Sequence, residues 1–273
     1  MIFDYNLNSY SFNKKSNTSF DSPLSEDIYD DVLNAYEQVI NKRFDNGICT
    51  RLDNCEDVEG KTVLTISPIR FFDYLLTNLL YLHYNLLIEH ISDKNKAQVK
   101  DFYYDLLMNN EPNSFSDILE KRQLSNLFAI SCVITDGNNY LITKRNDHVG
   151  IANNYISTSV TGIINDHDFK ENDPILSCCK REINEELGLT IQDNDMTVRQ
   201  IVCGSDKFQP AALVDVKVNN LNVAINRIND KTHFFDENCD FFLYTKKEIV
   251  ELLENQTVPL TETARTYFKI VTL

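Results

Sequence analysis

The sequence contains no pair of cysteines in the spacing C-x-x-C, and its seven cysteines are an odd number. Its five histidines do not cluster with the cysteines at the spacings of zinc ligands, which argues against a zinc site. Several cysteines lie in apolar runs, as Cys132 does in FAISCVI. We therefore expect reduced thiols in a cytoplasmic protein and no disulfide framework.

A long uninterrupted apolar run is also missing. The most apolar stretch, residues 74–88, is interrupted by Thr77, Asn78, His83 and Asn85, so it is too short and too polar to cross a bilayer. The N-terminal residues MIFDYNLNSYSFNKKSN have no apolar core typical of a signal peptide. No membrane partner is expected from this sequence.

Positive charge is scarce, with 26 Lys and Arg against 41 Asp and Glu and a net charge of −15. Such a field repels a phosphate backbone, so we expect no nucleic acid polymer as a partner. It permits a small anionic ligand whose charge is screened by a bound cation. The 273 residues suffice for one large domain or two modest ones, with the composition of a soluble globular protein.

The first 124 residues are predicted to be a mostly helical region whose role is open. Residues 1–25 resemble a loose arm, and residues 44–65 look irregular. Ser67 and Pro68 form a typical helix opening, and the helix that follows is apolar nearly all round, which suits a buried core or a homodimer interface. The expected helices cover residues 25–43, 67–91, 94–109 and 115–122.

Residues 125–273 are predicted to form a second domain of mixed α and β structure. A hairpin is indicated where TDGNN joins two β-like runs. The expected strands cover residues 127–134, 140–145, 154–164, 197–204, 210–218 and 240–245. The expected helices cover residues 174–187, 246–254 and 261–270, which predicts helices packed against a mixed sheet.

The helix at residues 174–187 carries an unusual concentration of charge. Asp173 is a good N-cap, Pro174 suits the first turn, and Gly188 can close the helix in a left-handed conformation. An apolar stripe of Ile175, Leu176, Cys179, Ile183 and Leu187 is expected to face the core. Glu182, Glu185 and Glu186 share another face, where they repel one another unless Arg181 and a hard cation offset their charge.

Residues 181–189, REINEELGL, match R-E-aliphatic-x-E-E-x-G-aliphatic, so the chain resembles the Nudix hydrolase family over about residues 125–273. The resemblance implies an α+β fold with a Nudix-like α/β/α sandwich and a mixed sheet, preceded by the mostly helical N-terminal region. It also implies metal-dependent cleavage of a pyrophosphate with Mg²⁺ or Mn²⁺ (magnesium or manganese). The family pattern reads G-x5-E-x7-R-E-U-x-E-E-x-G-U, where U is aliphatic.

The chain departs from this pattern in the first part of the motif. Counting back from Arg181 places the glycine at His167, whereas the best glycine is Gly162, which implies five extra residues. The early glutamate has two candidates. Asp173 has the spacing but a shorter side chain and already serves as a cap, while Glu171 has the residue type but lies two residues too far.

By resemblance, Glu182, Glu185 and Glu186 are the expected metal ligands, although Glu182 could instead orient or deprotonate the attacking water. Arg181 is expected either to orient these carboxylates or to form a simple helix salt bridge. A late acidic residue is expected in FFDENCDFFLY, which offers Asp236, Glu237 and Asp240. We favour Glu237, a few residues before the strand, and the alternative is a merely solvated loop acid.

Two further residues are candidates for substrate binding. Arg145 closes the second strand of the hairpin, where it could donate paired hydrogen bonds to phosphate or remain a surface charge. Gly162 could let the backbone pass close to the metal or phosphate region, or mark a plain bulge. Cys179 is expected to pack in the core, and no G-x-S-x-G elbow or Walker A sequence is present.

The substrate stays open at this point. The family default is a nucleoside diphosphate linked to another group, and the SQPWPFP stretch of NADH pyrophosphatases is missing, together with any tryptophan. An enzyme similar to isopentenyl-diphosphate isomerase would want a cysteine in YISTSVTG, which has none. A nucleotide-binding sensor with little turnover is the other alternative, and the three intact glutamates argue against it.

Overall fold

The computed structural model describes residues 2–7, 9–18, 20–40, 44–108, 114–120, 123–147, 154–205, 207–228, 238–255 and 257–272. Contacts between residues divide the chain into two compact units. The N-terminal unit comprises Ser9–Phe128 and Gly204–Pro210, and the C-terminal unit comprises Ile2–Asn8, Ala129–Cys203 and Ala211–Leu273. Each unit contains segments from both sides of the predicted domain boundary between residues 124 and 125. That boundary stays a prediction.

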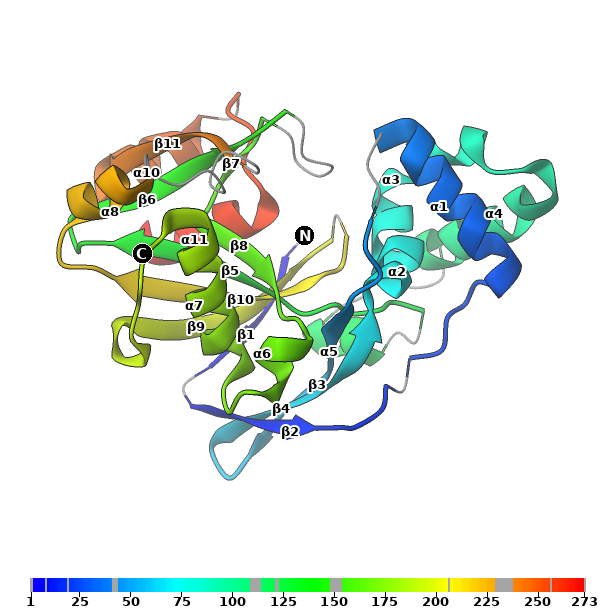
Figure 1. Cartoon of the computed structure of the whole chain (residues 1–273), viewed down its shortest axis with the longest axis horizontal. Coiled ribbons are helices and arrows are strands. Elements are labelled where there is room, and N and C mark those ends of the chain that lie inside the picture. The colour runs from blue at the N-terminus through cyan, green and yellow to red at the C-terminus, as the bar shows by residue number, and fades with distance from the viewer. Residues whose placement is uncertain are drawn as a thin grey trace. The chain divides into compact units, whose positions relative to one another are not determined.

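A three-stranded sheet in the N-terminal unit was not expected from the sequence. Its order is β2 (Tyr10–Lys14), β4 (Lys61–Arg70) and β3 (Ile48–Val58), with β2 parallel and β3 antiparallel to β4 (Figure 1). The prediction of an irregular segment at residues 44–65 is therefore wrong. Glu59 and Gly60 both have positive φ, as a two-residue hairpin turn of type I′ requires.

Polar residues inside β3 conceal its character in the sequence. Arg51 is buried, and its Nε lies 2.8 Å from Oδ1 of the equally buried Asp53. A buried ion pair of this kind satisfies both charges, so the strand tolerates residues that normally mark a surface loop. The sequence of β3 therefore does not show the alternation of polar and apolar residues that is typical of a strand in a half-buried sheet.

The helices of the N-terminal unit lie close to their predicted places, with one shifted start. Pro68 belongs to β4, so the expected helix at residues 67–91 begins at Phe71. Proline is tolerated there because the pairing of β4 with β2 already ends at Ile66. The helical elements are α1 (Glu26–Ile40), α2 (Phe71–Tyr74), η1 (Leu75–Leu79), α3 (Leu80–Leu87), η2 (Ile88–His90), α4 (Asp93–Met108) and α5 (Phe115–Glu120).

One polar residue of that apolar helix, Asn78 in the π-helical segment η1, is buried and hydrogen-bonded. The buried Asn78 donates from Nδ2 to the carbonyls of Lys207 and Phe208, at 2.8 and 3.0 Å. Its Oδ1 accepts hydrogen bonds from the backbone N–H and hydroxyl of Ser125. A single buried amide thus joins three segments of the N-terminal unit, including Gly204–Pro210.

The C-terminal unit is built on an eight-stranded mixed sheet. Its main path runs β1 (Ile2–Asn6), β9 (Met196–Gly204), β10 (Pro210–Lys217), β5 (Ala129–Thr135), β6 (Asn139–Arg145) and β11 (Asn238–Thr245), while β7 (Ile156–Ser157) pairs with β6 and β8 (Val160–Ile163) with β5. β10 is parallel to β5, whereas β6 and β8 are antiparallel to it. The expected strand at residues 154–164 is divided into β7 and β8, and the expected loose arm instead forms β1 and β2.

Helices cover both faces of this sheet. Ala129 and Val133 of β5 point into a core shared with α10 (Lys246–Glu254) and α11 (Glu262–Thr272). Cys132 points the other way, and its Sγ lies 3.3 Å from Sγ of Cys179 in α7 (Pro174–Leu187). The α+β class and the α/β/α layering are confirmed.

The remaining helical elements are short, and two α-helices among them were not predicted. The remaining elements are α6 (Asp166–Lys170), η3 (Asp193–Asp195) and α8 (Leu221–Ile228), of which α6 and α8 are the two α-helices that were not predicted. In the part of the chain that the structure describes, no helix combines the length and the apolar character needed to cross a bilayer.

Replacing Phe268 with alanine tests the core between α11 and the sheet. The side chain is fully buried in that core, so we expect the free energy of unfolding to fall by about 3–5 kcal/mol. The measurement is urea unfolding followed by far-ultraviolet circular dichroism. Val250→Ala on the exposed side of α10 is the control and should stay within about 0.5 kcal/mol of wild type. Equal effects of the two changes would contradict this packing.

Candidate active site on α7

The helix α7 begins and ends where its capping residues predict. Asp173 caps it by accepting a hydrogen bond from the backbone N–H of Leu176 at 3.0 Å, and Pro174 opens the first turn. Gly188 closes it with φ of 65°, in the left-handed conformation. These local signals fix which residues face the sheet. They also put Glu182, Glu185 and Glu186 on a common side of α7, and these three residues are called the glutamate face.

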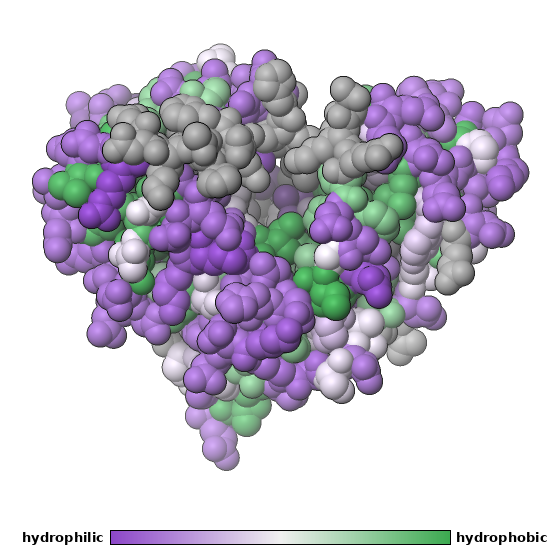
Figure 2. All heavy atoms as spheres, viewed as in Figure 1, coloured by the Kyte–Doolittle hydropathy of each residue, from purple (hydrophilic) through white to green (hydrophobic). Residues whose placement is uncertain are grey.

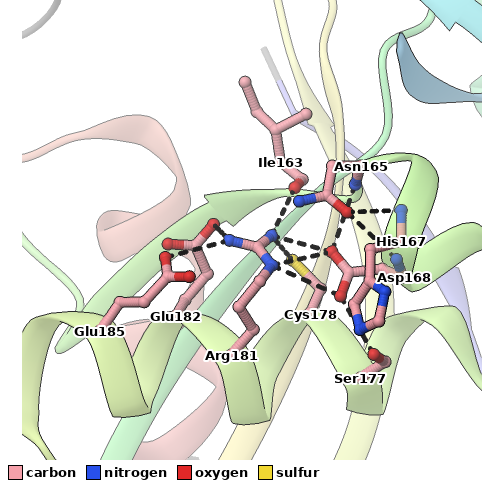
Figure 3. Close-up of polar contacts among 9 residues, drawn as sticks. All are labelled: Ile163, Asn165, His167, Asp168, Ser177, Cys178, Arg181, Glu182 and Glu185. Carbon is pink, nitrogen blue, oxygen red and sulfur yellow. Dashed lines mark hydrogen bonds and ion pairs between the residues drawn. The ribbon is translucent and has the colours of Figure 1, made fainter. Parts of the chain in front are cut away.

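Arg181 connects most of the polar groups around the glutamate face (Figure 3). One terminal nitrogen, Nη1, lies 2.7 Å from Oε1 of Glu182 and 3.3 Å from Oε2 of Glu185. Nη2 lies 2.8 Å from Oδ2 of Asp168 and donates to the carbonyl of Ile163 in β8 at 3.0 Å. Burial alone would lower the pKa of Arg181, but its hydrogen bonds to Asp168 and the charge of Glu182 raise that pKa above the ordinary value.

Asp168 is the residue of this site that sequence analysis missed. Its side chain is 0% exposed, against 20% for Arg181. Ser177 donates a hydrogen bond to its Oδ1 at 3.0 Å, and the backbone N–H of Asn165 donates to Oδ2 at 3.2 Å. Asn165 in turn caps α6 by accepting from the backbone N–H of His167 and Asp168. The short helix α6 therefore holds one buried carboxylate against Arg181.

The position of Asp168 can be compared with the motif that the chain resembles. Counting forward from Gly162, five residues separate it from Asp168, as in the first part of the family pattern. The five extra residues then lie between Asp168 and Arg181. Glu171 is exposed at the end of α6, and Asp173 caps α7, so neither contacts Arg181 among the hydrogen bonds of the described residues. The spacing counted forward from Gly162 was the signal in the sequence that could have identified Asp168.

Gly162 lies directly against Glu182. A Cβ atom at this position would fall 2.3 Å from Cγ of Glu182 and 2.5 Å from its Oε1. Such distances are far below van der Waals contact, so any other residue would displace the glutamate. Gly162 sits in β8, paired with Ile130 of β5. Close approach of the backbone to a carboxylate, and not a bulge, accounts for this glycine.

Glu186 is the most buried member of the glutamate face, with 7% exposure. Nδ2 of Asn238, at the start of β11, donates to its Oε2 at 3.3 Å. Glu185 is exposed on the outer side of α7, and hydrophilic residues cover the surface over α6 and α7 in Figure 2. The three carboxylates therefore range from solvent to the edge of the core.

The glutamate face suits a hard divalent cation in its chemistry. Carboxylate oxygens at i, i+3 and i+4 are the donors that Mg²⁺ and Mn²⁺ prefer. Within the described residues, no three His, Cys, Asp or Glu side chains already converge on one point in ligating geometry. Glu182 and Glu185 are both turned toward Arg181. The absence of a side chain at Gly162 makes room for Glu182.

The register of the sheet brings Arg145 to the same region. Arg145 is paired with Asn238 across β6 and β11. Side chains of directly paired residues leave an antiparallel sheet on the same face. Because Asn238 reaches Glu186, Arg145 projects on the α7 side of the sheet. The predicted late acid, Glu237, lies outside the described residues.

The thiols near the site are buried. Burial raises the pKa of Cys178 and Cys179 well above the ordinary value, and for Cys179 the hydrogen bond with Cys132 raises it further. A thiol that stays protonated is a poor nucleophile. Cys178 also lies in contact with Arg181, with Sγ 3.4 Å from Nη2. Both cysteines pack α7 against the sheet.

Comparisons with known proteins give a weak likeness of structure and no match of sequence. No protein-family model and no curated protein sequence match the chain. The structure of DR0079 from Deinococcus radiodurans is similar with a TM-score of 0.37 and 10% identity, covering 53% of this chain and 82% of that chain. A hydrolase of the Nudix family from Clostridium perfringens gives 0.33 and 13%, covering 54% and 95%. Because both TM-scores are low, we argue function from the side chains.

Replacing Asp168 with alanine tests the buried ion pair. The change leaves the Arg181 guanidinium without its buried partner, and we expect a loss of about 3 kcal/mol in the free energy of unfolding, near the lower end for such pairs because Arg181 is partly exposed. The control is Asp166→Ala, which removes an exposed pair with Lys170 and should cost less than about 1 kcal/mol. The measurement is urea unfolding of both variants. Similar losses in the free energy of unfolding would contradict the buried ion pair between Asp168 and Arg181.

Replacing Gly162 with alanine tests the close approach to Glu182. The added methyl group meets a flexible side chain, so we expect Glu182 to move while the melting temperature changes by only about 2–4 °C. Affinity for Mn²⁺, measured by titration calorimetry, should fall about tenfold. Gly47→Ala, where a Cβ meets nothing within 4 Å, is the matched control. Unchanged Mn²⁺ affinity in Gly162→Ala would show that the site does not depend on this contact.

Proposed function

We propose that the chain is a metal-dependent hydrolase that cleaves a pyrophosphate bond in a nucleoside diphosphate linked to another group. The observation that carries the proposal is the glutamate face of α7, organised by Arg181 and backed by Gly162 inside the sequence REINEELGL. The proposed substrate is small and phosphorylated, and the proposed setting is the cytoplasm. A homodimer formed by the N-terminal unit remains part of the same hypothesis.

The proposed metal ligands are Glu182, Glu185 and Glu186. Mg²⁺ or Mn²⁺, when bound, neutralises diphosphate oxygens and lowers the pKa of a coordinated water. Glu186 is held by Asn238 at the edge of the core, which suits a ligand that must keep one geometry. Glu182, which lies close to the backbone of Gly162, is proposed to ligate the metal or to accept a proton from the attacking water.

The two arginines have different proposed roles. Arg181 is occupied by Asp168, Glu182 and Glu185, so it orients carboxylates and does not bind substrate. Arg145 projects on the α7 side of the sheet and is proposed to donate hydrogen bonds to substrate phosphate. The late acidic residue, for which Glu237 is the candidate, would add a carboxylate just before Asn238 in the chain.

Replacing Glu186 with glutamine tests the function directly. Purified protein is incubated with Mg²⁺ or Mn²⁺ and nucleoside triphosphates, dinucleoside polyphosphates, ADP-ribose, NAD(H), nucleotide sugars or coenzyme A, and released phosphate is measured after phosphatase treatment. We expect wild type to hydrolyse one class and Glu186→Gln to lose at least about 100-fold in kcat, because a metal-binding charge is removed without changing the shape of the side chain.

The matched control is Glu251→Gln on the exposed surface of α10, which should retain full activity. Wild-type rates in Glu186→Gln would overturn the metal assignment. No turnover on any compound, together with thermal stabilisation by one of the nucleotides, would instead favour a nucleotide-binding sensor.

A further inference from the structure

A β-bulge opens the last strand of the sheet beside the glutamate face. The register of β11 against β6 shifts between Asn238 and Asp240, so that Asp240 pairs with Lys144 while Asn238 pairs with Arg145. Cys239 is the extra residue, and its Sγ lies 3.6 and 3.5 Å from the carbonyl oxygens of Lys144 and Arg145. Bulges near the ends of strands re-aim the side chains that follow or precede them.

The bulge reverses the face on which Asn238 leaves the strand. Phe242 and Tyr244 pack against the core shared with α10 and α11, together with Ile142 of β6. In a regular strand, successive even-numbered residues share one face. Asn238 would then point toward α10 and α11. Because of the extra residue, the side chain of Asn238 leaves the sheet on the same face as that of Arg145, which is the face on the side of α7.

The reversed side chain meets Glu186. Asn238 is 3% exposed and Glu186 7%, and the Nδ2-to-Oε2 distance is 3.3 Å. An ionised carboxylate only accepts hydrogen bonds, so the amide must present its N–H groups to it. A hydrogen bond to a charged acceptor in a buried place is worth more than one in solvent. The contact therefore restricts Glu186 to a small range of rotamers.

We infer that Asn238 is a positioning residue that fixes the Glu186 carboxylate for metal binding. This inference rests on the proposed function. The amide donates to Oε2 of Glu186, so it holds this carboxylate at one of its two oxygens, beside the other members of the glutamate face. An amide suits this place, since it supplies a donor to Glu186 without adding another negative charge that would repel the ligand.

The test measures Mn²⁺ binding to full-length protein without substrate, from the electron paramagnetic resonance signal of free Mn²⁺. Asn238→Leu keeps the approximate size of the side chain and removes the donor. We expect its dissociation constant for Mn²⁺ to rise at least about tenfold, as for other residues that orient metal ligands. On a hydrolysed substrate, kcat should fall while KM for the substrate changes less than about twofold.

Asp240→Leu places the same side chain two residues further along β11, on the other face, and should bind Mn²⁺ within about twofold of wild type. If Asn238→Leu melts early by circular dichroism, Asn238→Ala takes its place, because it removes the amide without adding apolar bulk. Equal affinity in wild type and either Asn238 variant, or equal weakening in Asp240→Leu, would overturn the inference.

The same experiment separates this inference from the proposed function. Hydrolysis by wild type with unchanged Mn²⁺ affinity in the Asn238 variants defeats the positioning role alone. Weakened Mn²⁺ binding in those variants, with no turnover on any compound of the panel, supports the positioning role and defeats the hydrolase. Failure of wild type to bind Mn²⁺ overturns the positioning role together with the metal assignment.

Discussion

The buried ion pair between Asp168 and Arg181 is the interaction on which the site depends. A carboxylate with no exposure is costly to bury unless its charge is matched, and here the guanidinium of Arg181 matches it with two close nitrogens. The same guanidinium reaches the carbonyl of Ile163 in β8. One side chain thereby ties α6, α7 and β8 together, and it sets where the glutamate face lies relative to Gly162.

The guanidinium of Arg181 also contacts two members of the glutamate face. Arg181 is in contact with the carboxylates of Asp168, Glu182 and Glu185, while Glu186 accepts a hydrogen bond from the neutral amide of Asn238. Asp168 accepts hydrogen bonds from both Nε and Nη2, while Nη1 lies 2.7 Å from Oε1 of Glu182, so one guanidinium contacts several carboxylates. Carboxylates held close with unmatched charge raise the free energy of the folded chain unless a cation joins them. Under the proposed function, a divalent cation on the glutamate face would relieve this repulsion between carboxylates.

Features set by local chemistry were predictable from the sequence, and features set by distant pairing were not. The ends of α7 follow from Asp173, Pro174 and Gly188, each acting on its own turn. The strand β3 escaped prediction because Arg51 and Asp53 satisfy each other in the interior. The shared face of the three glutamates needed only helical periodicity. The contact between Asn238 and Glu186 needed the bulge in β11, which the residue pattern alone does not reveal.

The insertion in the motif shows why Asp168 was also hidden. The five extra residues fall between α6 and Arg181, in a connection and in the first turns of α7. Lengthening such a connection costs little, because loop-closure entropy grows slowly with length. Asn165 caps the start of α6 and Asp173 caps the start of α7, so each helix has its own N-terminal cap on either side of the connection. The spacing from Gly162 to Asp168 and the sequence from Arg181 to Gly188 each agree with the pattern that the chain resembles, and the departure lies in the number of residues between Asp168 and Arg181.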